Sequence, residues 1–186
     1  MVTNFYREIT ASAPIITMPK AKKQLKVEET VTDEEDLILS SIDAAQGAVS
    51  NFINRVIAES NFVMELAKFE PKITFERNWE NDKIAKVEYY APGATELKLL
   101  PSEQYKLQVS TVVECFDIKF LTMPETEKRD DAVIVTVKQG FTASTCPTPL
   151  IQAMMLRLSD FFERREDREQ GNNPASNNLA RAYRKY

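Results

Sequence analysis

Two stretches with the periodicity of helices bracket a middle stretch with the periodicity of strands, and this order constrains the fold most strongly. Apolar residues of the first helical stretch recur three or four positions apart, at Ile38, Ile42, Ala45, Val49, Phe52 and Val56. Those of the second are Leu150, Ile151, Met154, Met155, Leu158, Phe161 and Phe162. Such spacing places apolar side chains on one face of a helix. We therefore predict an α+β fold: a helical bundle of a short and two long helices with an inserted antiparallel β unit.

The first long helix is expected over about residues 32–54, and Asn54 suits a left-handed C-cap because asparagine tolerates that conformation. Thr32 and Glu35 have the spacing of a capping box, in which the two side chains bond free backbone amides of the first turn. Acidic residues crowd this turn, where the helix dipole favours negative charge, namely Asp33, Glu34, Glu35 and Asp36. A Ca²⁺ or Mg²⁺ site is the alternative, but the cluster lacks the alternating ligands and turn glycine of a calcium loop.

A short helix is expected before it, over about residues 18–26. Thr17 suits an N-cap, and Pro19 suits the first helical turn. The face of this helix carries three cations, Lys20, Lys22 and Lys23. We interpret them as a solvated face, with binding to a membrane or to nucleic acid as the alternative.

The middle of the chain, about residues 60–138, alternates apolar and polar residues as half-buried strands do. Candidate strands cover residues 62–66, 73–76, 84–90, 96–99, 105–109, 116–120 and 132–137. Four aromatic residues suit core packing or a subunit interface, with a stacking surface as the alternative: Phe75, Trp79, Tyr89 and Tyr90. The second long helix follows over about 149–169, so that one domain is expected over residues 17–170.

The two ends of the chain differ from this domain. Residues 1–16 are expected to form an extended N-terminal arm, in which Ile15 and Ile16 suit pairing with a strand or a neighbouring subunit. Residues 171–186 contain too few apolar residues for a core, so we expect a C-terminal tail that is either disordered or ordered on a partner. Anchors and charged contacts for a partner would come from Arg181, Tyr183, Arg184, Lys185 and Tyr186.

The composition argues against the commonest catalytic and cofactor sites. The chain has no histidine, and its two cysteines, Cys115 and Cys146, form no C-x-x-C pair. With only four glycines, it has no phosphate loop, dinucleotide fingerprint or nucleophile elbow. We therefore expect no enzyme activity, no cofactor and no bound metal, and we interpret both cysteines as small apolar residues, buried or half exposed.

Charge and hydropathy exclude further classes. A net charge of −4 argues against a protein that coats nucleic acid, which needs a basic surplus. No stretch reaches the roughly 18–20 apolar residues of a transmembrane helix. Charges interrupt the N-terminal region too early for a secretory signal, so we expect a protein made in the cytoplasm, with no membrane partner.

Four stretches carry a family resemblance through their order along the chain. Residues 18–27 combine a basic helix with a hydrophobic–basic–Val step, and residues 33–55 open acidic and continue with spaced isoleucines and alanines. Residues 133–141 read as a strand that ends in Gly-aromatic, and residues 147–165 place two prolines before an apolar helix. In this order they resemble the gp6-like head–tail connector (adaptor) family of tailed bacteriophages and gene transfer agents. The chain departs from the family pattern at Asn54, Cys146 and Phe161.

The resemblance implies a structural subunit of the virion neck, made in the host cytoplasm. Such subunits form a ring, commonly of about twelve copies, between the portal and a downstream stopper or tail-completion protein. The ring extends the channel through which genomic DNA passes, without sequence-specific binding. The five C-terminal residues named above become candidates for portal binding, and the lysines of the short helix and Asp33, Glu34 and Asp36 become candidates for subunit contacts.

Two alternatives to the connector remain. One is a protein-binding module outside virions, which would be a stable monomer without affinity for a portal. The other is another neck component, such as a head-completion stopper. Stoppers are typically rich in β-barrel structure and lack two long helices, so the helical bracketing of this chain argues against the second alternative.

Overall fold

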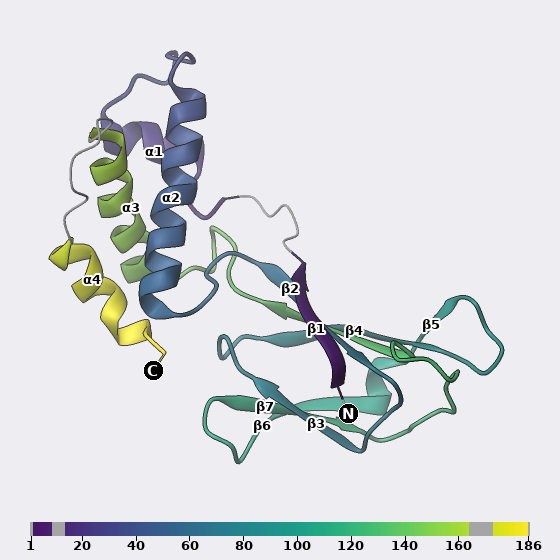
Figure 1. Ribbon diagram of the computed structural model, residues 1–186. Coiled ribbons are helices and arrows are strands. Elements are labelled where there is room, and N and C mark those ends of the chain that lie inside the picture. Colours follow the sequence, from purple (N-terminus) through teal and green to yellow (C-terminus); the bar gives the residue numbers. More distant parts are fainter. Residues whose placement is uncertain (1, 9–13, 164–172, 186) are drawn as a thin grey trace. The chain divides into compact units, whose positions relative to one another are not determined.

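The protein is described by a computed structural model over residues 2–8, 14–163 and 173–185 (Figure 1). The chain divides into two compact units. The β unit comprises residues 1–10 and 59–140, and the helical unit comprises residues 11–58 and 141–186. The predicted α+β class is confirmed, because four α-helices and two antiparallel sheets form within the described residues.

The helical unit is built around two long helices. Its elements are α1 (Met18–Leu25), α2 (Glu35–Ile53), α3 (Thr148–Glu163), α4 (Pro174–Ala180) and the 3-10 helix η2 (Arg181–Tyr183). α2 packs against α3, and α3 packs against α4. The apolar residues spaced at three and four positions form the core of this unit, including Ile38, Ile42, Ala45, Leu150, Met154 and Leu158. Helical periodicity therefore identified most of the buried positions, although Phe52, Val56, Ile151, Met155 and Phe161 are only half buried.

The ends of the helices agree only in part with the sequence prediction. Asn54 is the left-handed C-cap of α2, with φ 54° and ψ 40°, as expected. The predicted capping box at Thr32 is wrong, because α2 begins at Glu35 and its N-terminal cap has no side-chain hydrogen bond. The Glu35 carboxylate bonds Lys22 instead. α3 ends at Glu163 in the described chain, and residues 164–169 of the predicted helix lie outside the described residues.

The β unit contains two antiparallel sheets. The five-stranded sheet has the order β1 (Val2–Glu8), β2 (Ser60–Leu66), β8 (Val133–Gln139), β4 (Lys83–Tyr90) and β5 (Leu97–Leu99). The three-stranded sheet has the order β3 (Lys72–Glu76), β7 (Cys115–Phe120) and β6 (Tyr105–Val109), with a 3-10 turn η1 (Ser102–Gln104) before β6. The predicted insertion of about residues 60–138 agrees with these strands.

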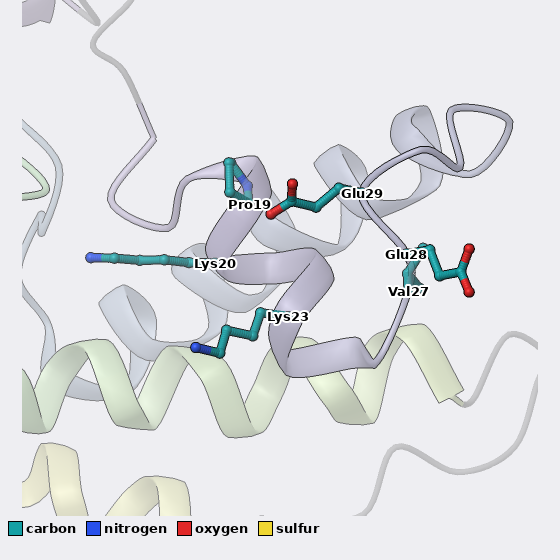
Figure 2. A pocket seen from close by; sticks show the side chains of 6 residues that line it. All are labelled: Pro19, Lys20, Lys23, Val27, Glu28 and Glu29. Atoms are coloured by element: carbon teal, nitrogen blue, oxygen red, sulfur yellow. The ribbon is translucent and has the colours of Figure 1, made fainter.

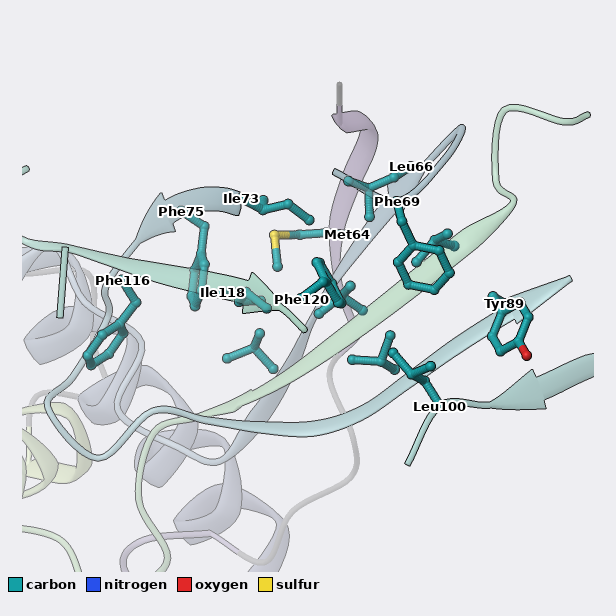
Figure 3. Close-up of a cluster of buried hydrophobic side chains, with 14 residues drawn as sticks. Met64, Leu66, Phe69, Ile73, Phe75, Tyr89, Leu100, Phe116, Ile118 and Phe120 are labelled. Carbon is teal, nitrogen blue, oxygen red and sulfur yellow. The ribbon is translucent and has the colours of Figure 1, made fainter. Parts of the chain in front are cut away.

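The core of the β unit lies between its two sheets (Figure 3). Fourteen buried residues from both sheets and their loops form it: Met64, Leu66, Phe69, Ile73, Phe75, Val87, Tyr89, Leu100, Phe116, Ile118, Phe120, Val133, Val135 and Val137. The Phe69 ring lies edge-on to both Tyr89 and Phe120, with centroids 5.6 and 5.2 Å apart. Such edge-to-face packing is the arrangement that aromatic rings favour.

The N-terminal residues correct the prediction of a single extended arm. Residues Val2–Glu8 form strand β1, which pairs antiparallel with β2 along its length. Ile15 and Ile16 pair with no strand and are buried in the helical unit. The two isoleucines are stabilised there by removal of apolar surface from water, which needs no strand partner. The predicted arm is therefore divided between the two units.

Candidate interaction surfaces

The C-terminal segment, residues 173–185, is folded onto the helical unit, in contrast to the predicted tail. Asn173 is the N-cap of α4: its side-chain oxygen accepts a hydrogen bond from the Ser176 amide at 2.9 Å. Its side-chain amide donates to the Asp160 carboxylate at 2.6 Å. Ser176 is buried and donates its hydroxyl proton to the Ala153 carbonyl at 2.9 Å. These polar contacts order a segment whose apolar content is low.

The end of this segment also contacts the C-terminal end of α2, as the traces in Figure 1 show. The Lys185 amide donates to the Ile53 carbonyl at 2.9 Å. The Arg55 guanidinium donates through Nε to the Tyr183 carbonyl at 3.0 Å. The Arg184 guanidinium carbon lies 5.2 Å from the centroid of the Phe52 ring. Residues near the C-terminus therefore contact the C-terminal end of α2 through both backbone and side-chain groups.

Four cations belong to this segment or to the residue it contacts after α2, and we call them the C-terminal basic surface: Arg55, Arg181, Arg184 and Lys185. Arg181 and Arg184 are exposed, whereas Arg55 and Lys185 are half buried. Tyr183, also predicted as a portal contact, is half buried beside them, and Tyr186 lies outside the described residues. Sequence reasoning missed Arg55, because nothing local connects the residue after the α2 cap with a segment more than 120 positions later.

The other predicted contact residues lie on α1 and at the N-terminal end of α2. Among them, the side chain of Lys22 is buried. The Lys22 side chain is only 4% exposed. Its ammonium group donates to the Glu29 and Val31 carbonyls at 3.0 and 2.6 Å and pairs with the Glu35 carboxylate at 2.6 Å. A buried ammonium needs such a set of acceptors to replace its hydration. Lys22 therefore orders the loop between α1 and α2 and is not available for a neighbouring subunit.

Lys20 and Lys23 remain exposed on α1 and line a shallow pocket of about 430 Å³ together with Pro19, Val27, Glu28 and Glu29. Figure 2 shows both lysines extending in the same direction, with Glu28 pointing away from them. The pocket lies against the loop that Lys22 holds.

The acidic residues at the start of α2 lie at this same end of the helical unit. Asp33 and Asp36 are exposed, and Glu34 is half buried. The ion pair between Lys22 and Glu35 joins α1 to the first turn of α2. The lysines and the acidic residues therefore form one mixed-charge end of the helical unit.

The β unit presents apolar surface that the sequence did not single out. Val109, Val112 and Val113 are 66, 54 and 86% exposed at the turn between β6 and β7. Strand periodicity cannot identify such residues, because valine suits buried strands equally well. The four aromatic residues considered for a stacking surface are mostly core: Phe75, Trp79 and Tyr89 are buried, and Tyr90 is half buried below the Arg129 guanidinium.

The described residues contain no group of three His, Cys, Asp or Glu side chains that could hold a metal ion. Both cysteines are free thiols, and burial raises the pKa of Cys146 to about 11. A thiol with this pKa stays protonated at neutral pH and is a poor nucleophile. Across residues 2–8, 14–163 and 173–185, no helix is long and apolar enough to cross a membrane.

Comparison with known proteins gives a match at the level of structure. No protein family matches the sequence, and no curated protein does either. A chain from the neck of an empty gene transfer agent particle, computed with C6 symmetry, aligns with a TM-score of 0.69 at 18% identity. That alignment covers 98% of this chain and 96% of the other.

Two further structures agree with this match. A chain from the virion of a native gene transfer agent particle gives a TM-score of 0.68 at 17% identity, over 98% of this chain and 95% of the other. A chain from a native neck computed with C12 symmetry gives 0.68 at 14% identity, over 97% and 96%. The protein therefore has the fold of chains found in gene transfer agent particles, over nearly its full length.

Proposed function

We propose that the protein is a head–tail connector (adaptor) subunit, a structural and non-enzymatic component of the virion neck. The observation that carries this proposal is the shared fold over 97–98% of the chain with chains from gene transfer agent necks. The family resemblance of the sequence, which rests on different features, supports the same function. Both long helices and the β insertion contribute to the shared fold, so the likeness does not rest on one common motif.

The subunit forms a ring of about twelve copies in this proposal. One of the similar chains comes from a neck computed with C12 symmetry, and another from a neck computed with C6 symmetry. A head-to-tail ring needs two different complementary surfaces on each subunit. The exposed residues Lys20, Lys23, Asp33 and Asp36, together with Glu34, contribute to one of them.

The ring lies between the portal and a downstream stopper or tail-completion protein and extends the DNA channel. The net charge of −4 suits a channel through which DNA passes without binding tightly. Arg181, Tyr183, Arg184, Lys185 and Tyr186 contact the portal, and a weak contact repeated around a ring becomes a strong attachment through multivalency.

Mass photometry tests this function on the purified protein, alone and mixed with the portal protein of the same genome. We expect a rise in mass that corresponds to about a dozen copies per portal ring. A protein that stays monomeric and never associates with the portal would contradict the proposal and favour a protein-binding module outside virions.

A further inference from the structure

The five-stranded sheet of the β unit has two edges, formed by β1 and β5 (both labelled in Figure 1). Among the strands that the structure describes, β1 pairs only with β2, and β5 pairs only with β4. An edge strand presents a row of backbone N–H and C=O groups that can form hydrogen bonds with a strand of another chain. Both edges of this sheet can therefore be extended by a partner.

Both edge strands also expose apolar side chains. Phe5 of β1 and Leu99 of β5 are 68 and 61% exposed, and Tyr6 and Leu97 are exposed as well. Sheets usually protect an edge with lysine, proline or a short strand. β1 extends over seven residues and contains neither lysine nor proline. Its length and its exposed aromatic rings suit a strand that becomes covered on assembly.

We infer that β1 of one subunit pairs with β5 of a second copy of this chain, so that the sheets of neighbouring subunits join edge to edge. This inference rests on the proposed function, because it names the surfaces through which subunits of the connector ring bind one another. A head-to-tail ring needs two different surfaces on each subunit. The two edges of one sheet provide such a pair.

The directions of the strands are compatible with this contact. Every neighbouring pair in the sheet is antiparallel, so β1, β8 and β5 all run in the same direction. Rotation about an axis along the strands preserves their direction, so β5 of one copy meets β1 of the next as a parallel pair.

The symmetry of the similar assemblies favours a second copy in this arrangement. Pairing of β1 with β1 would be a twofold contact, which closes a dimer and does not continue around a ring. Two of the similar chains come from necks computed with C6 and C12 symmetry. Cyclic assemblies of this kind need a contact that continues from each subunit to the next.

The side chains of the two edges are complementary on the core side of the sheet. Residues directly opposite each other on paired strands lie on the same face. Phe5 is opposite Met64, and Lys98 is opposite Tyr89. Met64 and Tyr89 both belong to the core between the sheets, so Phe5 and Lys98 lie on this face. Edge-to-edge pairing brings the aromatic ring and the ammonium group to the same side, where a cation–π contact is favourable.

The other face of the sheet carries an apolar match. Tyr6, Leu97 and Leu99 lie on this face, because they alternate with Phe5 and Lys98 along their strands. Contact between the tyrosine ring of one copy and the two leucines of the next removes apolar surface of both edges from water.

Disulfide cross-linking tests the contact, with the protein alone and with the portal protein of the same genome. In a Cys115→Ser background, Tyr6→Cys is combined with Leu97→Cys or with Leu99→Cys, which covers two alternative registers. Mild oxidation is expected to give a series of covalent multimers that continues beyond the dimer. Each single variant is expected to give no covalent product, because its cysteine faces no cysteine in the neighbouring copy. The remaining native cysteine, Cys146, is buried.

A matched control uses an exposed residue outside the two edges. Val113 is 86% exposed at the turn between β6 and β7. Tyr6→Cys combined with Val113→Cys is therefore expected to give no covalent multimers. Thermal unfolding of every variant checks that the fold is retained.

Lysine substitutions test the same contact without a cross-link. Phe5→Lys places a like charge on the face of Lys98, and Leu99→Lys protects the edge as lysine does in other sheets. Each is expected to raise the concentration at which half of the protein is assembled by at least about tenfold, measured by mass photometry. Val113→Lys, the control, is expected to change this concentration by less than about twofold.

The outcomes separate the inference from the proposed function. Covalent dimers from Tyr6→Cys alone would show that β1 pairs with β1 and would overturn the inference. Portal-bound rings of normal mass from both lysine variants, without cross-links in the double variants, would overturn it while leaving the connector function standing. Weaker portal binding with unchanged ring mass would assign the edges to another protein and would also overturn it. Cross-linked multimers that never bind the portal would support the edge contact and contradict the connector function.

Discussion

The helical unit and the β unit are stabilised in different ways. The β unit has a broad core rich in aromatic residues, in which side chains of two sheets fill the space between them. The helical unit has an aliphatic core between α2, α3 and α4, and buried polar groups complete its ends. Lys22 holds the α1–α2 loop, and Ser176 holds α4 to α3. The β unit therefore depends mainly on the apolar side chains buried between its sheets. The ends of the helical unit depend mainly on hydrogen bonds to buried polar groups.

The largest effect is expected from a cavity in the β core. Ile118 is fully buried in β7, and Ile118→Ala should lower the free energy of unfolding by about 2–5 kcal/mol, because it removes buried apolar surface and leaves a cavity. Trp79 is the only tryptophan of the chain and lies in the β unit, so its fluorescence reports this unit during denaturation in urea.

A matched substitution in the other unit tests whether the two units unfold separately. Ile42→Ala removes a buried side chain from α2 and should shift the transition seen by circular dichroism at helical wavelengths. If each substitution shifts the fluorescence and dichroism transitions equally, the units unfold as one body, and the comparison does not hold for stability.

The second largest effect is expected at Lys22. Lys22→Met keeps much of the apolar stem but leaves the Glu29 and Val31 carbonyls without their donor. An unsatisfied buried acceptor is costly, so we expect a loss of about 1–3 kcal/mol, measured by urea unfolding followed by dichroism. Lys23→Met on the exposed side of the same helix should change stability by less than about 0.5 kcal/mol. Equal effects of the two substitutions would contradict the structural role of Lys22.

A smaller and more local effect is expected at α4. Ser176→Ala removes the buried hydrogen bond to the Ala153 carbonyl and should favour local opening of α4 by about 1 kcal/mol. Hydrogen exchange of the α4 amides measures this opening directly. Asn178→Ala, at an exposed position of the same helix, is the control. Faster exchange in the control than in the Ser176 variant would show that this bond does not hold the segment.

The smallest effects are expected from two buried carboxylates of the β unit, with opposite signs. Burial raises the pKa of Asp82 above its ordinary value of 3.8. Its contribution to stability is therefore present below pH 3.8 and is lost as the pH rises through the raised pKa. A hydrogen bond from Thr74 lowers the pKa of Asp117, so its contribution is present above pH 3.8 and is lost as the pH falls through the lowered pKa.

Urea unfolding followed by Trp79 fluorescence at a series of pH values measures both signs. As the pH rises above about 4, Asp82→Asn should gain stability relative to the unmodified protein. As the pH falls below about 4, Asp117→Asn should gain stability relative to the unmodified protein. Parallel pH profiles for the two variants would mean that at least one of the two carboxylates lacks the environment described.

The elements of the fold were largely predictable from sequence, whereas the surroundings of the candidate contact residues, such as the burial of Lys22, were not. The buried faces of α2 and α3 follow from apolar residues three and four positions apart, and the strands follow from alternation. The arm and the tail were misjudged because β1 and α4 are ordered by contacts with distant residues. The Asn173-Pro174 pair does carry a local signal, since Asn suits an N-cap and Pro suits the first helical position.

The sequence alone determined the α+β class, the position of the β insertion, the buried helical faces and the left-handed cap at Asn54. These properties depend on neighbours within one or two turns or on alternate residues of one strand. The tertiary structure alone decided that Lys22 points inward, that the C-terminal segment folds onto α3, and that Arg55 joins the basic surface. Each of these depends on which distant carbonyl or ring satisfies a polar group, and a linear pattern of residue types does not encode that pairing.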